Sequence, residues 1–204
     1  GVQRVLFRSS SNAAILDTSN TLLWRFNRTR LDAESVRDAM LAVSGNLDAT
    51  MYGPGSLDEG HRRRSIYFMI KRSRLIPSMQ IFDAPEPLVS IGERPSTTVA
   101  PQALMFMNNP HVRSYASGFA SRLLAEKVPE NNGGNGSRME FLVRQAYLSA
   151  IGRPPENAES ADARQFLEAQ SKRYAADGRA NAEQLALADF CQVLFSLNEF
   201  AYVE

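Results

Sequence analysis

The 204-residue sequence has few residues of the kinds that build disulfides and metal sites: one cysteine, Cys191, and two histidines, His61 and His111. One thiol excludes an internal disulfide, a zinc site of several cysteines and the C-x-x-C-H attachment of a c-type haem. Neither histidine has a second histidine or a cysteine at ligand spacing, so we expect no metal and no cofactor in this chain. Cys191 lies on an apolar helical stripe, where a thiol typically packs as a small buried side chain.

Long apolar runs and the common catalytic motifs are also missing. No window approaches the ~18 consecutive apolar residues that a membrane helix needs, so we expect no membrane span. There is no nucleophile elbow, no H-E-x-x-H pair and no phosphate loop. Gly53, Gly55 and Gly60 do not have the spacing of a dinucleotide-binding motif. The residues alone therefore assign no reaction.

A net charge of either sign is nearly absent, because 23 basic residues face 22 acidic ones, for a net charge of +1. This balance requires neither a nucleic acid nor an anionic membrane as partner. The distribution is uneven, however: residues 1–74 carry 12 basic and 7 acidic residues, and residues 75–204 carry 11 and 15. The split indicates either that the two parts attract each other or that each has its own partner.

The first nine residues have no convincing period, and Val5 to Ser9 match the translated tail of a common sequencing adapter. We interpret residues 1–9 as a relic without evolved information, with an amphipathic edge strand as the alternative. Without Arg4 and Arg8, the net charge of the first part falls from +5 to +3.

Helical spacing of apolar residues predicts a mainly α fold, an irregular helical domain with at most one small β element. The first helix should follow an N-cap at Asp32 and stop at Gly45, with Glu34, Arg37 and Asp38 facing away from the core. A short helix is expected at residues 100–109, and Asn109 with the proline after it should open the next one.

Three further helices are expected after residue 137. The predicted organisation is a helical core over residues 10–129, truncated at its N-terminus, a flexible linker at 130–137 and a C-terminal three-helix subdomain at 138–204. Residues 66–71 alternate in the manner of a strand, and residues 87–92 are the best candidate partner. The apolar residues Leu22, Leu23, Trp24 and Phe26 favour core packing over a base-stacking platform.

The residues that most resemble a site are the acids and bases of one segment. The acids could supply a carboxylate pair for acid–base chemistry, and the bases flank aromatic residues in the manner of a nucleic-acid surface. Solvated charges that protect the end of a strand are the simpler interpretation of the basic run. The candidates are Asp48, Asp58, Glu59, His61, Arg62, Arg63, Arg64, Lys71, Arg72 and Arg74.

Several longer stretches together resemble a known family. They are "NTLLWRFNRTRLDAESVRDAMLAVSG", "RRSIYFMIKRS", "IFDAPEP", "STTVAPQALMFMNNPHV", "AIGRPP" and "CQVLFSLNEFAYVE". From Ser10 to Glu204 the chain resembles the planctomycete C-terminal domain of unknown function found in large proteins with a cytochrome-c-like module. The resemblance implies an exported (periplasmic or extracellular) fragment of a multi-domain protein, with any haem held in upstream domains of that parent protein. It implies no reaction and no catalytic residues.

The leading hypothesis is therefore a non-catalytic interaction or structural module whose partners are other domains of the parent protein. A part of a polysaccharide-degrading enzyme, acting through acids of residues 48–59, is the first alternative. A polyanion- or nucleic-acid-binding module, acting through residues 62–74, is the second, and nucleic acid is the less favoured partner.

Overall fold

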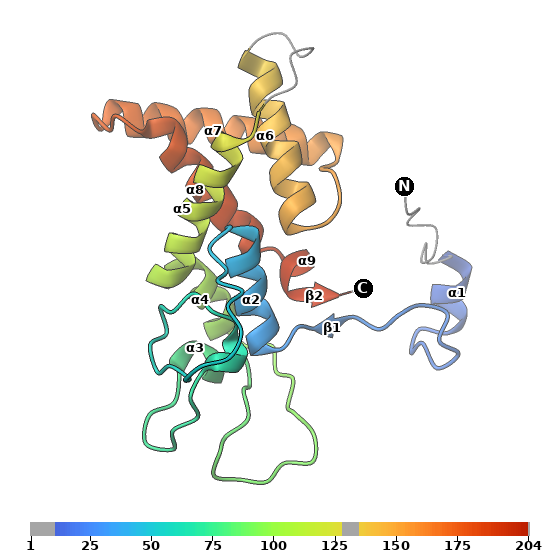
Figure 1. The fold of residues 1–204 in the computed structure, drawn as a ribbon. Helices are drawn as coiled ribbons and strands as arrows, with labels where there is room; N and C mark the ends of the chain where they lie inside the picture. Colours follow the sequence, from blue (N-terminus) through green and yellow to red (C-terminus); the bar gives the residue numbers. More distant parts are fainter. Residues whose placement is uncertain (1–10, 128–134, 204) are drawn as a thin grey trace.

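The computed structural model describes residues 11–127 and 135–203, and it confirms a mainly α fold with one minor β element (Figure 1). In chain order the elements are α1 (Ser11–Leu16), β1 (Thr29–Arg30), α2 (Ala33–Val43), the 3-10 helix η1 (Ser65–Tyr67), α3 (Pro77–Ile81), α4 (Ala100–Asn108), α5 (Pro110–Ala125), α6 (Asn135–Ala150), α7 (Asn157–Ala176), α8 (Ala182–Phe195), α9 (Asn198–Ala201) and β2 (Tyr202–Val203).

The core forms where α8 packs along α5 and α7, and Figure 1 shows α5 and α8 crossing at the centre of the molecule. Both helices carry apolar residues at helical spacing, which gives each a continuous apolar face. The rings of Phe119 on α5 and Phe195 on α8 are stacked with their centroids 5.9 Å apart, and both side chains are fully buried. One continuous core therefore includes residues from both sides of the predicted linker.

The start and the end of α2 lie where the sequence predicts them. Asp32 precedes the helix in an extended conformation, but its side chain makes no capping hydrogen bond and its carboxylate lies 3.4 Å from Arg94 instead. Gly45 has a φ of 72°, and Asn46 N–H donates to Leu41 O at 3.0 Å, so the chain leaves the helix in a Schellman turn.

The position of the β element differs from the prediction. The strand predicted at residues 66–71 and its partner at 87–92 are both absent, and β1 pairs antiparallel with β2 instead, with Thr29 opposite Val203. The alternating segment is held by a short turn: Tyr67 N–H donates to Arg64 O, and Phe68 N–H donates to Ser65 O. The segment also bonds to the preceding loop, since Ser56 N–H donates to Tyr67 O and Met69 N–H donates to Ser56 O, both at 2.8 Å. Ser56 and Phe68 thus form an isolated bridge in place of a strand pair.

The segment before β1 lies apart from the helical body (Figure 1). Core packing is the wrong prediction for three of its apolar residues, since Leu22, Leu23 and Phe26 are 82%, 76% and 54% exposed. Trp24 is half-buried, and its indole N–H donates to Asp17 O at 2.7 Å. Local hydrogen bonds therefore order this segment, and its apolar side chains stay in solvent.

Two predictions concern segments that lie wholly or largely outside the described residues. The proposed relic at residues 1–9 is outside them. The predicted linker, residues 130–137, is described only at its end, where α6 already begins at Asn135. The last residues assigned to the linker are therefore helical.

Candidate interaction site

Arg37 of α2 is the buried side chain that holds the candidate segment, residues 48–74, and the prediction that Arg37 faces away from the core is wrong. Its side chain is 4% exposed although it carries a charge. The guanidinium donates to Arg63 O at 3.0 Å, to Glu59 O at 3.4 Å, to His61 O and to Ser65 Oγ at 3.2 Å. Burial lowers the pKa of Arg37, and the nearby Tyr115 and Asp38 oppose that effect. Three carbonyls of the segment thus converge on one side chain of α2.

Asp38, the residue after Arg37 in α2, binds the same segment. Its carboxylate accepts hydrogen bonds from the backbone N–H and the hydroxyl of Ser65, both at 2.7 Å. Arg64 Nε lies 3.6 Å from the second oxygen of the carboxylate, but the Arg64 side chain is 64% exposed and its contribution is small. Arg37 and Asp38 therefore fix the start of η1 against α2.

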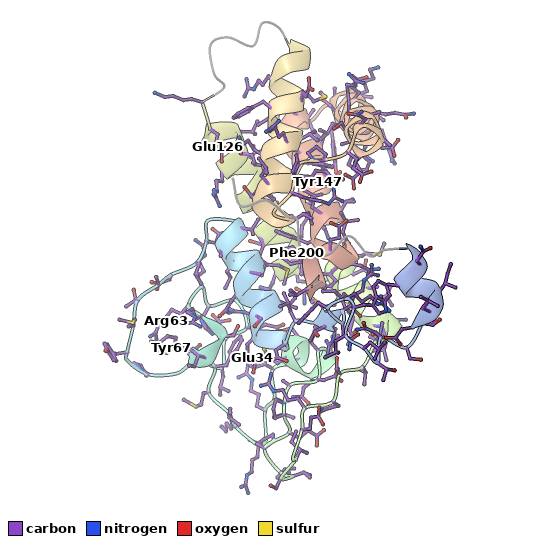
Figure 2. All side chains as sticks on the ribbon, turned by 90° about the vertical axis from the view of Figure 1, so that its right-hand side faces the viewer. Glu34, Arg63, Tyr67, Glu126, Tyr147 and Phe200 are labelled. Carbon is purple, nitrogen blue, oxygen red and sulfur yellow. The ribbon has the colours of Figure 1, made fainter. Side chains whose placement is uncertain are left out.

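Arg63 closes the preceding loop, as Figure 2 shows by its position beside Tyr67. Its guanidinium lies over the Tyr67 ring, 3.4 Å from the centroid. It donates to Thr50 O at 3.3 and 3.2 Å, to Pro54 O at 3.1 Å and to Tyr52 O. Arg63 therefore acts as a loop clasp and is not free to bind a ligand.

We expect Arg63→Ser to lower the free energy of unfolding by about 1 to 2 kcal/mol, because several loop carbonyls lose their donor. Arg62→Ser is the matched control, since Arg62 is exposed and the change should stay within about 0.5 kcal/mol. Urea denaturation of both variants measures the difference. Equal losses in the two variants would contradict the assignment of Arg63 as the clasp.

The candidate acids of the loop bond to their own neighbours. The Asp48 carboxylate accepts from Thr50 N–H at 2.9 Å and Thr50 Oγ1 at 2.5 Å, and these bonds lower the pKa of Asp48. The Asp58 carboxylate accepts from Gly60 N–H at 2.9 Å. Both acids therefore stabilise turns, and the lowered pKa of Asp48 makes its carboxyl group a poor proton donor near neutral pH.

His61 packs between an aromatic ring and a cation. Its ring contacts Phe68 edge-on with centroids 4.5 Å apart, and both of its ring nitrogens are buried without a hydrogen-bond partner among the described residues. Burial lowers the pKa of His61, and the charge of Arg37 lowers it further. The folded protein therefore favours the neutral imidazole.

The sign of this shift predicts a loss of stability in acid. Below its ordinary pKa of 6.5, His61 takes up a proton in the unfolded chain but resists it in the folded protein. The free energy of unfolding should then fall as the pH drops below about 6.5, until the lowered folded-state pKa is passed. Urea titrations between about pH 7.5 and pH 5.5 measure the loss. His61→Leu should remove this part of the pH dependence; an unchanged dependence would contradict it.

The remaining candidate bases are available to a partner. Arg62, Lys71, Arg72 and Arg74 are exposed, and in the described ranges none of them forms an ion pair. Lys71 and Arg74 sit close together because Arg74 N–H donates to Lys71 O at 2.9 Å. The predicted basic surface is thus divided into structural arginines and free cations.

A groove of about 470 Å³ opens beside these cations, and sequence reasoning did not identify it. It lies between α2, the segment after η1, α3 and the connection that leads to α4. Charged residues as far apart in sequence as Glu34 and Arg94 line it, and its apolar lining includes strongly exposed side chains. Its lining includes Glu34, Asp38, Arg64, Ile66, Met69, Ile70, Lys71, Arg74 and Arg94.

Glu34 and Arg94 close one side of the groove through a paired contact. Arg94 Nη1 and Nη2 donate to the two oxygens of Glu34 at 2.8 and 2.7 Å. Hydrogen bonds from Arg94 lower the pKa of Glu34, which keeps the carboxylate ionised. No local pattern could predict this pair, because the two residues stand 60 positions apart. Figure 2 places Glu34 at the lower end of α2, where the long connections begin.

A second clasp lies away from the groove, inside the quoted stretch "AIGRPP". Arg153 pairs with Glu159 at 2.7 Å and with Glu199 at 2.6 Å. The contacts join the turn after α6 to the start of α7 and to α9. This part of the resemblance therefore includes a residue with a clear structural task.

Residues 11–127 and 135–203 contain neither a metal-binding cluster nor a membrane-spanning helix. In that part of the chain no three or more histidine, cysteine, aspartate or glutamate side chains gather where they could hold a metal ion. None of the helices described there is both long and apolar enough to cross a bilayer. Cys191 is fully buried as predicted, and burial strongly raises the pKa of its thiol.

Comparison with known proteins gives a family but no activity. No curated protein and no solved structure matches the chain. A family model matches residues 4–167, from near the start of the chain into α7, and leaves α8 and α9 outside the match. Since this range is more than half of the sequence, the chain belongs to the family described as PSD1, a protein of unknown function (DUF1553).

Proposed function

We propose that this chain is a non-catalytic interaction module of an exported, cytochrome-associated, multi-domain planctomycete protein. In this role it docks through the cations Arg62, Lys71, Arg72 and Arg74 against an acidic surface of another domain of that protein. The observation that carries the proposal is the division of the candidate segment. Arg37, Asp38 and Arg63 hold it in place, and the cations beside them are exposed without an ion-pair partner among the residues that the structure describes.

Such a division suits a docking surface because a rigid support reduces the ordering cost of binding. Export and the link to a cytochrome rest on the sequence resemblance alone. In the proposed protein any haem belongs to upstream domains, and this chain supplies the contact surface.

The two alternatives have less support. A polysaccharide-degrading role needs two converging carboxylates, whereas Asp48 and Asp58 each bond to their own turn. Tight nucleic-acid binding needs several simultaneous phosphate contacts, and Arg63, the middle residue of the basic run, is already bonded to loop carbonyls.

The test mixes this chain with the remaining domains of the parent protein, produced separately, and follows complex formation by sedimentation. We expect a complex at low salt that weakens as salt screens the charges. Lys71→Glu with Arg72→Glu and Arg74→Glu should abolish it. Reversing the exposed cations Arg144, Arg164 and Lys172 of α6 and α7 is the control with the same change in net charge.

Two results would contradict the proposal. One is the absence of any complex, or an equal loss in the control variant. The other is sub-micromolar binding to duplex DNA at physiological salt, with affinity falling steeply as salt rises, since that behaviour reports several phosphate contacts.

A further inference from the structure

We propose that the groove between α2 and the segment after η1 binds an extended acidic peptide that carries apolar side chains. The inference rests on the proposed interaction role and names the chemistry of the ligand. The groove volume of about 470 Å³ lies within the range of roughly 300 to 1,000 Å³ typical of ligand pockets.

The charge left for a ligand in this groove is positive. Its acids are already engaged, since Arg94 holds Glu34 and Ser65 holds Asp38. Lys71 and Arg74 also line the groove, and within the described ranges neither has an ion-pair partner. A carboxylate-bearing ligand would supply the missing counter-charges.

The apolar lining requires more than charge from the ligand. Ile66, Met69 and Ile70 are 73%, 47% and 78% exposed, and all three line the groove. Clustered exposed apolar side chains favour burial against a partner. A ligand with apolar side chains between its carboxylates would cover them and pair with Lys71 and Arg74 at the same time.

The groove is also firmly built on its inner side, where Asp38 and Ser65 fix η1 to α2. The connections on either side of α3 extend away from the helical body (Figure 1). The chain can therefore present the groove without folding on binding, and this lowers the cost of recognition. A nucleic-acid duplex would use the two free cations but would leave the apolar wall uncovered.

The experiment measures binding of labelled short peptides to the full chain by fluorescence anisotropy. The first peptide alternates glutamate with leucine, the second alternates glutamate with serine, and the third alternates lysine with leucine. We expect the glutamate–leucine peptide to bind about tenfold or more tightly than either of the others. Equal binding of the two glutamate peptides would overturn the proposal, because it would reduce recognition to charge.

Paired variants locate the site. Lys71→Glu with Arg74→Glu should weaken the glutamate–leucine peptide about tenfold or more, whereas Arg72→Glu with Lys172→Glu, of the same charge change, should not. Arg72 is an informative control because it stands between the two residues in sequence but does not line the groove. An equal loss in both variants would overturn the placement.

Ile70→Ser tests the apolar wall and should weaken the same peptide about tenfold. Leu88→Ser is its control, since Leu88 is 68% exposed and lies outside the groove. Because all of these side chains are exposed, the variants should keep the melting temperature of the unchanged protein. Unaltered binding by Ile70→Ser, or tighter binding of a DNA duplex than of the peptide, would overturn the inference.

The two proposals fail separately in these experiments. If the complex with the parent domains forms but no peptide binds, the interaction role stands and the groove is not its site. If the peptide binds in the groove but no complex forms, the ligand chemistry stands and the proposed partner is wrong.

Discussion

Replacing Arg37 with leucine is expected to lower the free energy of unfolding by about 3 kcal/mol or more, one of the largest single-residue effects in the protein. The substitution removes the hydrogen-bond donor but not its acceptors. Leucine supplies apolar volume, but the carbonyls of Glu59, His61 and Arg63 stay in place and lose the donor that satisfies them. Backbone carbonyls cannot be mutated away with their partner, so no compensation is available.

Urea denaturation measures this effect, and Arg62→Leu is the control because it removes an exposed arginine of the same segment. Arg37→Lys should recover only part of the stability, since a lysine ammonium cannot reproduce the planar fork of a guanidinium. A variant Arg37→Leu as stable as Arg62→Leu would show that the buried guanidinium is not what fixes the segment to α2.

Phe195→Ala is expected to lower the free energy of unfolding by about 3 to 5 kcal/mol. The Phe195 ring is fully buried, with the Phe119 centroid at 5.9 Å and the Phe200 centroid at 5.0 Å. Alanine would leave a cavity where α5, α8 and α9 meet. The unfolding should remain one transition for both parts of the chain, because the core is continuous across them.

Val193→Ala provides the control on the same helix, because Val193 is 44% exposed and its loss should stay below about 1 kcal/mol. Thermal and urea unfolding, followed by circular dichroism, measure both variants. Two separate transitions in the unchanged protein would contradict a shared core.

The sequence predicts most helices because their signals are local. Gly45 ends α2 with a positive φ, and Asn109 caps α5 by accepting a hydrogen bond from His111 N–H at 2.8 Å. Periodicity also places Arg37 four residues before the buried Leu41 and four after the buried Ala33. That spacing was the available signal for its burial. A charged side chain at such a position is nevertheless expected to face solvent, unless its hydrogen-bond acceptors are known.

The candidate site was predicted only as a charged segment. Lys71, Arg72 and Arg74 are exposed and stay a predicted site, whereas Arg63 bonds to loop carbonyls and the carboxylates of Asp48 and Asp58 bond within their own turns. The groove itself was missed because its walls come from separate parts of the chain.

By itself the sequence determined the longer helices, the Asn109 cap, the Gly45 stop, the buried thiol and the place of the basic segment, since each depends on neighbours within a few residues. Only the tertiary structure decided that Arg37 points inward, that residues 66–71 form no strand and that β1 pairs with β2. It also decided that Glu34 and Arg94 meet across 60 positions to close a groove. Each of these features depends on contacts between distant residues, whose free energy is gained only when the whole chain has packed.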